Sequence, residues 1–196
     1  MDFKELTEKF GGKLDAQAKW DDCVVVSREY LHNVVAFLKD DPSCKMDMLV
    51  DIAGVDYLTY PNHEGPRFAI SYAFKSLKHP GLRLRLKVLV SESDLKVPTI
   101  SDLYANANWY EREVFDQFGI VFTGHPDLRR LLNHVEFVGH PLRKDYPAQK
   151  RQWLSTNDYL LPELEKRLED LGYRVVQRSK EVGTNDNEFL EGSIKE

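Results

Sequence analysis

The sequence predicts a two-layer α/β (α+β) domain in which helices cover one face of a mixed sheet. Strand-length segments with alternating apolar residues, helix-length segments with apolar residues at helical spacing, and turn residues between them support this fold class. The expected order is α-β-β-α-β-β-β, followed by another helix and an extended C-terminal arm. With 196 residues and 42% hydrophobic content, the chain is long enough to bury a core.

Two strands are predicted near the N-terminus, after a short helix. The helix covers residues 2–10 and ends at the Gly11-Gly12 pair, because glycine readily adopts the conformation that closes a helix. The strands cover residues 13–19 and 22–27, and the second contains three consecutive valines, which favour β structure.

The next helix is predicted to run from Ser27, whose hydroxyl suits an N-cap, to about Lys39. The apolar residues expected on its inner face are Tyr30, Val34, Phe37 and Leu38. Pro42 follows two aspartates and ends this helix, because proline has no amide hydrogen to donate.

Three strands with period-two alternation follow, and the alternation predicts which side chains face the core. The expected inward rows are Met48, Val50 and Ile52 in the first strand, and Phe68, Ile70, Tyr72 and Phe74 in the second. The third strand, residues 82–88, places leucines on one face and Arg83, Arg85 and Lys87 on the other. Residues 60–66 and 79–81 form the turns between strands. We expect water to cover the cationic face.

Residues 101–118 are predicted to form a helix with an apolar stripe and a charged face. The stripe comprises Leu103, Ala107, Tyr110, Val114 and Phe118. The opposite face comprises Trp109, Arg112, Glu113 and Asp116. Leaving the tryptophan in water forfeits roughly 2–3 kcal/mol of transfer free energy. Two explanations stay open: Trp109 folds back on Arg112 or Glu113, or a partner protein covers this face.

After this helix the chain carries two similar Gly-His-Pro motifs, which begin at Gly124 and Gly139. Glycine followed by X-Pro favours an extended, turn-rich backbone. From His125 to Arg151 there are six cations and three anions, although the whole chain has a formal charge of −5. Arginine suits buried interface pairs with carboxylates. Alternatively, these arginines pair with carboxylates of the preceding helix in the same chain.

Several residues of this segment are of types that bind metals, namely His125, Asp127, His140 and Asp145. Their spacing is not that of a zinc site, and no thiolate accompanies them. Each histidine precedes a proline, and we expect both to donate to backbone carbonyls. Two distant cysteines cannot supply an iron–sulfur cluster, and no nucleotide-binding or hydrolase motif occurs. The residues therefore predict a domain without a cofactor, metal or catalytic site of its own.

The sequence also limits where the protein can be located and whether it binds nucleic acid. No apolar stretch has the roughly 20 residues of a membrane-spanning helix, and the charged N-terminus lacks the apolar core of a signal peptide. We therefore expect the protein to stay in the compartment where it is made. The negative charge argues against a general nucleic-acid binder.

The most specific motifs are Asn-Trp-Tyr-Glu-Arg-Glu-Val-Phe-Asp at 108–116, Gly-His-Pro-Asp-Leu-Arg-Arg-Leu-Leu at 124–132 and Gly-His-Pro-Leu-Arg-Lys-Asp-Tyr-Pro at 139–147. The chain resembles, on these motifs, the C subunit of proton-pumping NADH–quinone oxidoreductase, respiratory complex I. Segments 49–57, 67–68 and 82–90 extend the resemblance to roughly residues 20–150. The spacer 133–138 departs from the family's pattern, which leaves the turn between the two Gly-His-Pro motifs unassigned.

The resemblance implies a subunit of the peripheral arm that docks on the D subunit near the quinone site and lies near other subunits such as B and I. It would support electron transfer from NADH to ubiquinone or another quinone, coupled to proton translocation. FMN and iron–sulfur clusters would belong to partner subunits, so the chain would be an enzyme only as part of the complex. The expected location is the cytoplasmic side of a bacterial inner membrane, peripheral and attached only through the complex.

The same resemblance assigns interface and assembly roles to one set of residues. They are Trp109, Glu111, Arg112, Glu113, Asp116, Gly124, His125, Pro126, Asp127, Arg129, Arg130, Gly139, His140, Pro141, Arg143, Lys144, Asp145 and Tyr146. If these residues face a partner, Arg143→Glu should leave the isolated domain folded and disrupt assembly.

We expect three regions: a core domain at 1–122, which includes the helix at 101–118, an interaction segment at 123–151, and a C-terminal helix with an acidic tail at 152–196. In the last region, Pro162 starts a helix that Gly172 ends. The leucines expected on that helix are Leu164, Leu168 and Leu171. A short strand at 173–176 and a tail at 179–196, disordered when alone, complete the prediction.

Two other functions remain as alternatives. The first is the equivalent subunit of a membrane-bound hydrogenase or formate hydrogenlyase, which the cysteine pairs of its nickel-binding partner would reveal. The second is an RNA-binding module built on residues 129–151. It lacks an aromatic platform and lies in an acidic protein, so it is the more remote alternative.

Overall fold

The computed structural model describes residues 14–15, 23–150, 152, 155 and 157–173. They fall into two compact units, one holding the residues up to His134 together with Gly139–Tyr146, the other holding Val135–Val138 and the residues from Pro147 onward. The helix expected at 2–10, most of the strand at 13–19 and the C-terminal tail lie outside the described residues. So does nearly all of the strand expected at 173–176. The three-region division stays a prediction.

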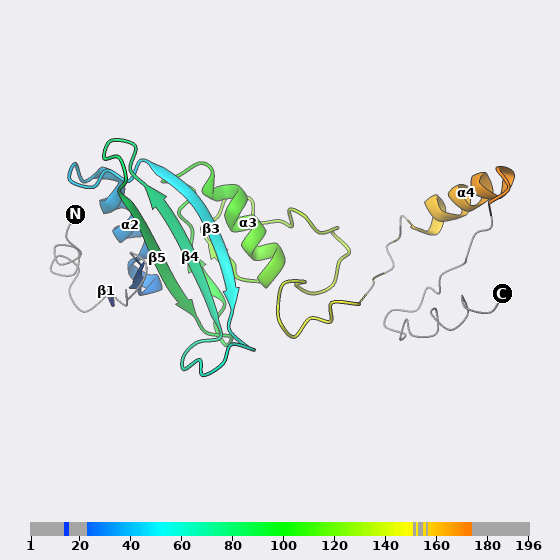
Figure 1. Ribbon diagram of the computed structural model, residues 1–196, viewed down its shortest axis with the longest axis horizontal. Helices are drawn as coiled ribbons and strands as arrows, with labels where there is room; N and C mark the ends of the chain where they lie inside the picture. The colour runs from blue at the N-terminus through cyan, green and yellow to red at the C-terminus, as the bar shows by residue number, and fades with distance from the viewer. Residues whose placement is uncertain (1–13, 16–22, 151, 153–154, 156, 174–196) are drawn as a thin grey trace. The chain divides into compact units, whose positions relative to one another are not determined.

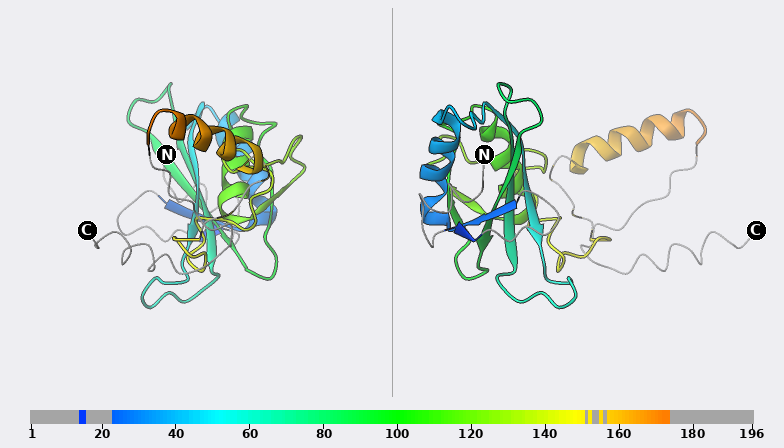
Figure 2. Two further views of the ribbon diagram at one scale, coloured as in Figure 1. Left: turned by 90° about the vertical axis from the view of Figure 1, so that its right-hand side faces the viewer. Right: turned by 60° about the vertical axis from the view of Figure 1, so that its left-hand side comes forward.

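The first unit contains a five-stranded mixed sheet, as the sequence predicts (Figure 1). Its strands, in sheet order, are β1 (Leu14–Asp15), β2 (Cys23–Val26), β5 (Arg83–Val90), β4 (Phe68–Lys75) and β3 (Met48–Asp56). The β2–β5 pair is parallel and the other neighbours are antiparallel. Helices α2 (Leu31–Asp40) and α3 (Ala107–Phe118) lie on the same face and share one core with the sheet (Figure 2).

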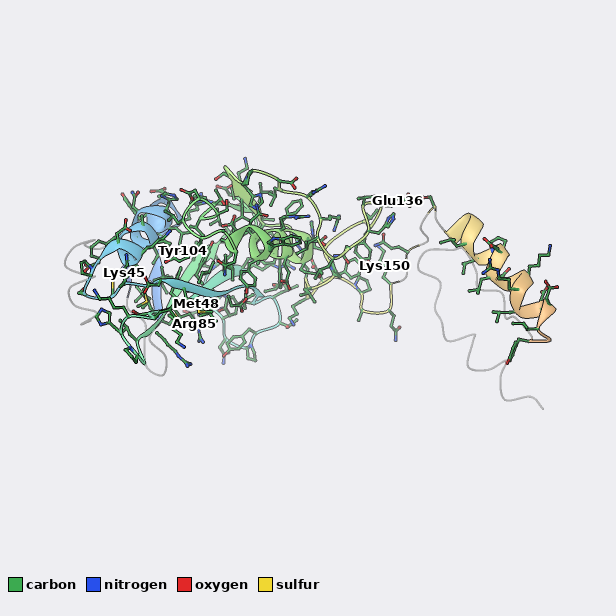
Figure 3. The ribbon with its side chains drawn as sticks, turned by 90° about the horizontal axis from the view of Figure 1, so that it is seen from above. Lys45, Met48, Arg85, Tyr104, Glu136 and Lys150 are labelled. Carbon is green, nitrogen blue, oxygen red and sulfur yellow. The ribbon has the colours of Figure 1, made fainter. Side chains whose placement is uncertain are left out.

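Two strands bury the side chains that their alternation predicts. The buried residues are Phe68, Ile70, Tyr72 and Phe74 in β4, and Leu84, Leu86, Val88 and Val90 in β5. Arg83 and Arg85 lie on the exposed face. Figure 3 shows Arg85 and Met48 on the side of the sheet away from the buried Tyr104. The uncovered face is thus the cationic one.

The prediction for β3 was partly wrong. Met48 and Val50 are 43% and 42% exposed, whereas Leu49 and Ile52 are buried. The register against β4 shifts between Leu49 and Asp51, which marks a β-bulge. A bulge adds one residue to a strand, so strict alternation fails across it and the inward row changes parity.

The start of the second helix also differs from the prediction. Ser27 makes no side-chain capping bond, and a 3-10 turn, η2 (Arg28–Tyr30), precedes α2. The fully buried face of α2 comprises Leu31, Val34, Val35 and Leu38, whereas Tyr30 and Phe37 fall outside it. As predicted, the helix ends beside Asp41, whose amide bonds the Phe37 carbonyl.

Helix α3 begins at Ala107 rather than at residue 101, because residues 101–106 form turns instead. The side-chain amide of Asn106 donates to the Leu49 carbonyl at 2.8 Å, and the Tyr110 hydroxyl donates to the Val50 carbonyl at 3.1 Å. These bonds satisfy backbone groups on the outer edge of β3, which would otherwise be open to other strands. Gly119, with φ of 76°, ends the helix.

After α3, strand β7 (Val121–Thr123) pairs in parallel with β6 (Lys96–Pro98) and forms a separate small sheet. The segment 124–146, called the ribbon below, has neither helix nor strand. It nevertheless makes the densest set of side-chain bonds to α3, and these bonds define the candidate site.

In the second unit, α4 (Asn157–Asp170) begins five residues earlier than predicted, so Pro162 lies inside it. The end is as predicted: Gly172 has φ of 81°, and the Tyr173 and Gly172 amides bond the Leu168 and Glu169 carbonyls. This is the two-bond closure that a left-handed glycine allows. None of the helices in the described ranges is long and apolar enough to cross a membrane.

Candidate functional site

Asp116, near the end of α3, organises the start of the ribbon. Its Oδ2 accepts hydrogen bonds from three consecutive backbone amides, those of Leu131 (3.1 Å), Leu132 (2.9 Å) and Asn133 (2.8 Å). Its Oδ1 lies 2.7 Å from NH1 of Arg130. Burial alone would raise the pKa of Asp116, but the bonds from Asn133, Arg130 and Leu132 outweigh it and lower the pKa to about 2. The carboxylate is therefore charged, and donors of the ribbon replace its water.

Glu111, near the start of α3, is buried differently. Its side chain has no exposed surface and accepts bonds from the Ile100 amide at 2.8 Å and the Thr99 hydroxyl at 2.5 Å. Desolvation dominates here and raises the pKa of Glu111 to about 7, although the bonds from Ile100 and Thr99 work against it. His125 lies nearby, with its Nε2 3.9 Å from Oε2 of Glu111.

Both histidines of the Gly-His-Pro motifs bond backbone groups, as the sequence predicts. His125 Nε2 donates to the Asn108 carbonyl at 3.2 Å, and its Nδ1 accepts the Asp127 amide at 3.0 Å. His140 Nδ1 donates to the Asp116 carbonyl at 3.0 Å. Burial and the nearby Arg143 and Arg130 charges lower the pKa of His140. Each histidine therefore fixes one motif to α3.

Three arginines of the predicted set also turn inward. Arg112 donates to the carbonyls of Arg129 and Arg130, each at 3.2 Å. Arg130 bonds the Gly139 carbonyl at 3.0 Å in addition to Asp116. Arg143 donates through Nε to the Phe118 carbonyl at 2.6 Å, and its guanidinium lies over the Phe68 ring. The explanation that the arginines bind within the chain thus holds for these three, mostly through backbone carbonyls.

The contacts of Arg143 change what we expect of the Arg143→Glu variant. Besides bonding Phe118, its NH2 lies so close to Gly119 that a Cβ there would come within 2.6 Å of it. A glutamate at position 143 would remove this support and place a negative charge beside an unpaired carbonyl. We now expect Arg143→Glu to weaken the domain itself rather than assembly alone.

A second anchor, which the sequence analysis did not single out, holds the end of the ribbon. Asp56, at the end of β3, accepts bonds from Nε of Arg67 at 3.1 Å and from the Lys144 amide at 2.9 Å. Arg67 also bridges to Glu92 at 2.6 Å and to Asp145 at 2.9 Å. The bonds from Arg67 and Lys144 overcome the desolvation of Asp56 and lower its pKa. No local pattern pointed to this anchor, because its residues come from segments far apart in the chain.

The remaining predicted residues are divided between turns and surface. Gly124 and Gly139 have φ of 85° and 98°, which explains the glycine that opens each motif. Asp127 and Arg129 pair with each other at 2.9 Å on the surface. Pro141, Lys144 and Tyr146 lie in the turns that close the ribbon, and Glu113 is exposed on α3. A Cβ on Gly139 would come within 3.0 Å of Tyr146 Cε2.

Three apolar side chains whose backbone is part of α3 or hydrogen-bonded to it are exposed, and we call them the exposed apolar surface: Trp109, Leu132 and Leu142. They are 59%, 66% and 53% exposed. The Arg112 guanidinium stacks on the Trp109 ring at 5.1 Å. The Leu132 amide bonds Asp116, and the Leu142 amide bonds the Gln117 carbonyl, so both leucines are fixed to α3. Stacking on Arg112 confirms one explanation for Trp109, yet most of the ring remains uncovered.

A shallow pocket of about 500 Å³ opens beside the other end of α3, at the carboxyl ends of β6 and β7. It is lined by His32, Pro98, Thr99, Ser101, Asp102, Thr123, Gly124 and Pro126. His32 and Asp102 pair at 2.8 Å. Among the described residues no group of three or more histidine, cysteine, aspartate or glutamate side chains is arranged to hold a metal.

Comparison with known proteins identifies the family of this chain. Residues 24–152 match the model of the family described as respiratory-chain NADH dehydrogenase, 30 Kd subunit. The C subunit of NADH-quinone oxidoreductase from Acidithiobacillus ferrooxidans is 49% identical over 126 residues, covering 63% of this chain and 62% of the relative. The same subunit from Burkholderia multivorans is 49% identical over 128 residues, with 64% and 63% covered. The matched part thus spans less than two thirds of these relatives.

Solved structures show the same fold. A trypsin-resistant fragment of Nqo5, residues 1–134, aligns with a TM-score of 0.55 at 38% identity, covering 65% of this chain and all of the fragment. A polypeptide of an archaeal membrane-bound sulfane sulfur reductase aligns with a TM-score of 0.57 at 22% identity, covering 91% and 95%. The second likeness shows the fold alone. The family match includes both Gly-His-Pro motifs and the helix that holds them, and the chain belongs to the family of the 30 kDa subunit of respiratory-chain NADH dehydrogenase.

Proposed function

We propose that this chain is the C subunit of an NADH–quinone oxidoreductase and that it binds the D subunit through the exposed apolar surface. Its contribution to electron transfer from NADH to quinone, coupled to proton translocation, is positional. It holds the D subunit in place near the quinone site. Family membership supports the assignment to this complex, and the geometry of the ribbon supports the mode of binding.

The observation that carries the proposal is a group of exposed apolar side chains whose backbone is part of α3 or hydrogen-bonded to it. Trp109, Leu132 and Leu142 are exposed, yet Trp109 is part of α3 and the amides of Leu132 and Leu142 are hydrogen-bonded to α3. Preordered aromatic and aliphatic side chains lose little conformational entropy on binding and often form the centre of an interface. The exposed Arg129 and Lys144 then belong to the polar rim.

The remaining parts of the proposal follow from the family rather than from geometry. We propose that FMN and iron–sulfur clusters reside in partner subunits and that this chain holds no cofactor. Subunits such as B and I are proposed as further neighbours. The proposed location is peripheral, on the cytoplasmic side of a bacterial inner membrane, with attachment only through the complex.

A second candidate is the equivalent subunit of another membrane-bound respiratory complex, such as a hydrogenase or formate hydrogenlyase. The fold shared with the sulfane sulfur reductase polypeptide favours keeping it. The 49% identity to NADH-quinone oxidoreductase subunits, against 22% to that polypeptide, favours the first candidate. Cysteine pairs for nickel in the co-purified partner would indicate the second.

The test compares two leucines of equal exposure. Leu132→Gln removes apolar area from the proposed interface, whereas Leu77→Gln does the same in the turn after β4; these leucines are 66% and 62% exposed. With the full-length chain tagged in its native membranes, we expect Leu132→Gln to reduce the co-purified D subunit and the NADH–quinone reductase activity. Leu77→Gln should change neither. Urea unfolding of the purified chains should be the same for both variants, within about 0.5 kcal/mol.

Three outcomes would contradict the proposal. One is wild-type recovery of the D subunit with Leu132→Gln and also with Trp109→Gln. Another is co-purification of a different set of partners, such as a nickel-binding subunit. Equal losses with Leu132→Gln and Leu77→Gln would likewise show that the effect does not come from the proposed surface.

A further inference from the structure

Helix α4 presents an uncovered leucine stripe. Leu160 and Leu164 are 60% and 50% exposed, and Leu171, just after the helix, is 72% exposed. Leu160, Leu161, Leu164 and Leu168 fall within an arc of about 100° on the helix, so the apolar side chains share one face. Tyr173, 64% exposed, extends that face beyond the helix end.

The helix has little to stabilise it except this face. It has 14 residues, a length at which isolated helices are marginal in water. Pro162 lies inside it and cannot donate the backbone bond expected at that position. Its C-terminus, in contrast, is closed by the bonds of Gly172 and Tyr173. The helix thus has a hydrogen-bonded C-terminus and an exposed apolar face, which are features of a helix that docks on a surface.

The borders of the stripe are acidic. Within α4 five residues are acidic and two are basic. Arg167, the cation of α4 beside the stripe, pairs with Glu163 at 2.5 Å, one turn away. Lys166 lies on the far side of the helix, whereas Glu165 borders the stripe directly. A complementary surface therefore needs basic residues along its edges.

We propose that α4 is a docking helix whose leucine stripe lies in an apolar groove, rimmed by lysine and arginine, on a partner polypeptide of the complex. The inference rests on the proposed function only in requiring that this chain assemble with partners. It concerns a face separate from Trp109, Leu132 and Leu142. A second copy of α4 is a poor occupant, because pairing two acidic-bordered helices would bring like charges together.

Trypsin offers a direct readout, because its target residues Lys166 and Arg167 lie in the middle of α4. The full-length chain, free and in the purified complex, is digested briefly, and cleavage at these two positions is followed by mass spectrometry. We expect cleavage in the complex to be slower by about tenfold or more, because a docked helix must first detach. In the free chain these bonds should be cut rapidly at every protein concentration.

Matched glutamine variants separate the stripe from the helix itself, because glutamine is a good helix former at either position. Leu160→Gln/Leu164→Gln should restore rapid cleavage in the complex, or reduce assembly without altering urea unfolding of the free chain. Glu169→Gln, which lies well away from the stripe on the helix surface, should leave protection intact.

Three results would overturn the proposal. They are equal cleavage rates in the free chain and in the intact complex, protection already present in the dilute free chain, and protection that depends on the concentration of the free chain. The second would place α4 on its own chain, and the third on another copy. Failure of the proposed function looks different, because the D subunit would then be missing from the purified material.

Discussion

The two ends of α3 bury a carboxylate in opposite ways. Asp116, at the ribbon end, meets three backbone amides and a guanidinium, and its pKa is lowered to about 2. Glu111, five residues earlier, meets one amide and one hydroxyl with no cation bonded to it, and its pKa is raised to about 7. Both are fully buried. The comparison shows that the number and charge of the donors, rather than burial itself, decide whether a carboxylate stabilises its surroundings as an anion.

The largest expected effect on stability is that of Asp116→Ala, which removes the charged carboxylate at the ribbon end of α3. Asp116→Ala would leave the amides of Leu131, Leu132 and Asn133 and the Arg130 guanidinium without their acceptor. Breaking a buried pair in this way typically costs about 3–5 kcal/mol. We expect a loss of that size in the free energy of unfolding, measured by urea denaturation of the full-length chain. Glu113→Ala, on the exposed side of the same helix, is the control and should stay within about 0.5 kcal/mol.

Asp116→Asn tests whether the charge of Asp116, rather than its size, organises the ribbon. The side chain keeps its size, but it loses its charge and one of its two acceptor oxygens, so either the three amides or Arg130 lose their acceptor. Most of the loss should therefore remain. If Asp116→Asn is as stable as the wild type, the charge of Asp116 does not organise the ribbon and the comparison fails.

The next effect concerns the cation that closes the same end. Arg143→Glu removes the bond to the Phe118 carbonyl and the contact with the Phe68 ring, and it adds an anion beside that carbonyl. We expect about 2–3 kcal/mol of destabilisation in the isolated chain, the range for lost bonds to charged groups and an unsatisfied buried acceptor. Unchanged urea unfolding combined with lost assembly would instead favour a purely intermolecular role for Arg143.

The sequence predicted the elements of the fold better than the roles of its charges. The β4 and β5 rows followed from alternation, since each strand has one solvated face. The β3 row failed because a bulge between Leu49 and Asp51 cannot be read from apolar spacing. The start of α3 was missed because residues 101–106 bury apolar side chains from turns, which have no fixed period.

For the candidate site, the residue types indicated a polar cluster near α3. They did not show whether its side chains point into the chain or towards a partner. A cluster of arginines fits an interface and an internal network equally well, because the same guanidinium geometry serves both. Which applies depends on nearby carbonyls, such as those of Phe118 and Gly139, and sequence does not place them. The anchor formed by Asp56 and Arg67 joins segments far apart in the chain to the ribbon, so no local motif could reveal it.

The pH dependence of stability should separate the two ends of α3. Asp116 has a lowered pKa, so its contribution is present above the unfolded value of 3.8 and is lost as pH falls towards about 2. Glu111 has a raised pKa, so the folded state retains a proton that the unfolded state has lost between 4.5 and about 7. Stability due to Glu111 should therefore fall as pH rises through that window, by roughly 3 kcal/mol at most.

His140 opposes this slope, because its lowered pKa makes stability rise with pH up to its ordinary value of 6.5. The comparison must therefore be made between the wild type and Glu111→Gln, in which the His140 contribution cancels. We expect the difference in unfolding free energy between the two to change steadily between pH 4.5 and 7 and to be constant above that range. A difference that stays constant throughout would mean that Glu111 is charged across the whole window.

The smallest expected effect is that of Glu111→Gln at about pH 4.5, where the folded wild type still holds the Glu111 proton. The glutamine oxygen can still accept the Ile100 amide, and its amide group can donate to the Thr99 hydroxyl, which is then free to donate to Ser101. Because glutamine replaces a carboxyl group that is neutral in the folded protein at this pH, the free energy of unfolding should change by no more than about 1 kcal/mol. A loss as large as that of Asp116→Asn would show that Glu111 acts as an anion after all. The two ends of α3 would then be alike in chemistry, and their difference would be only one of geometry.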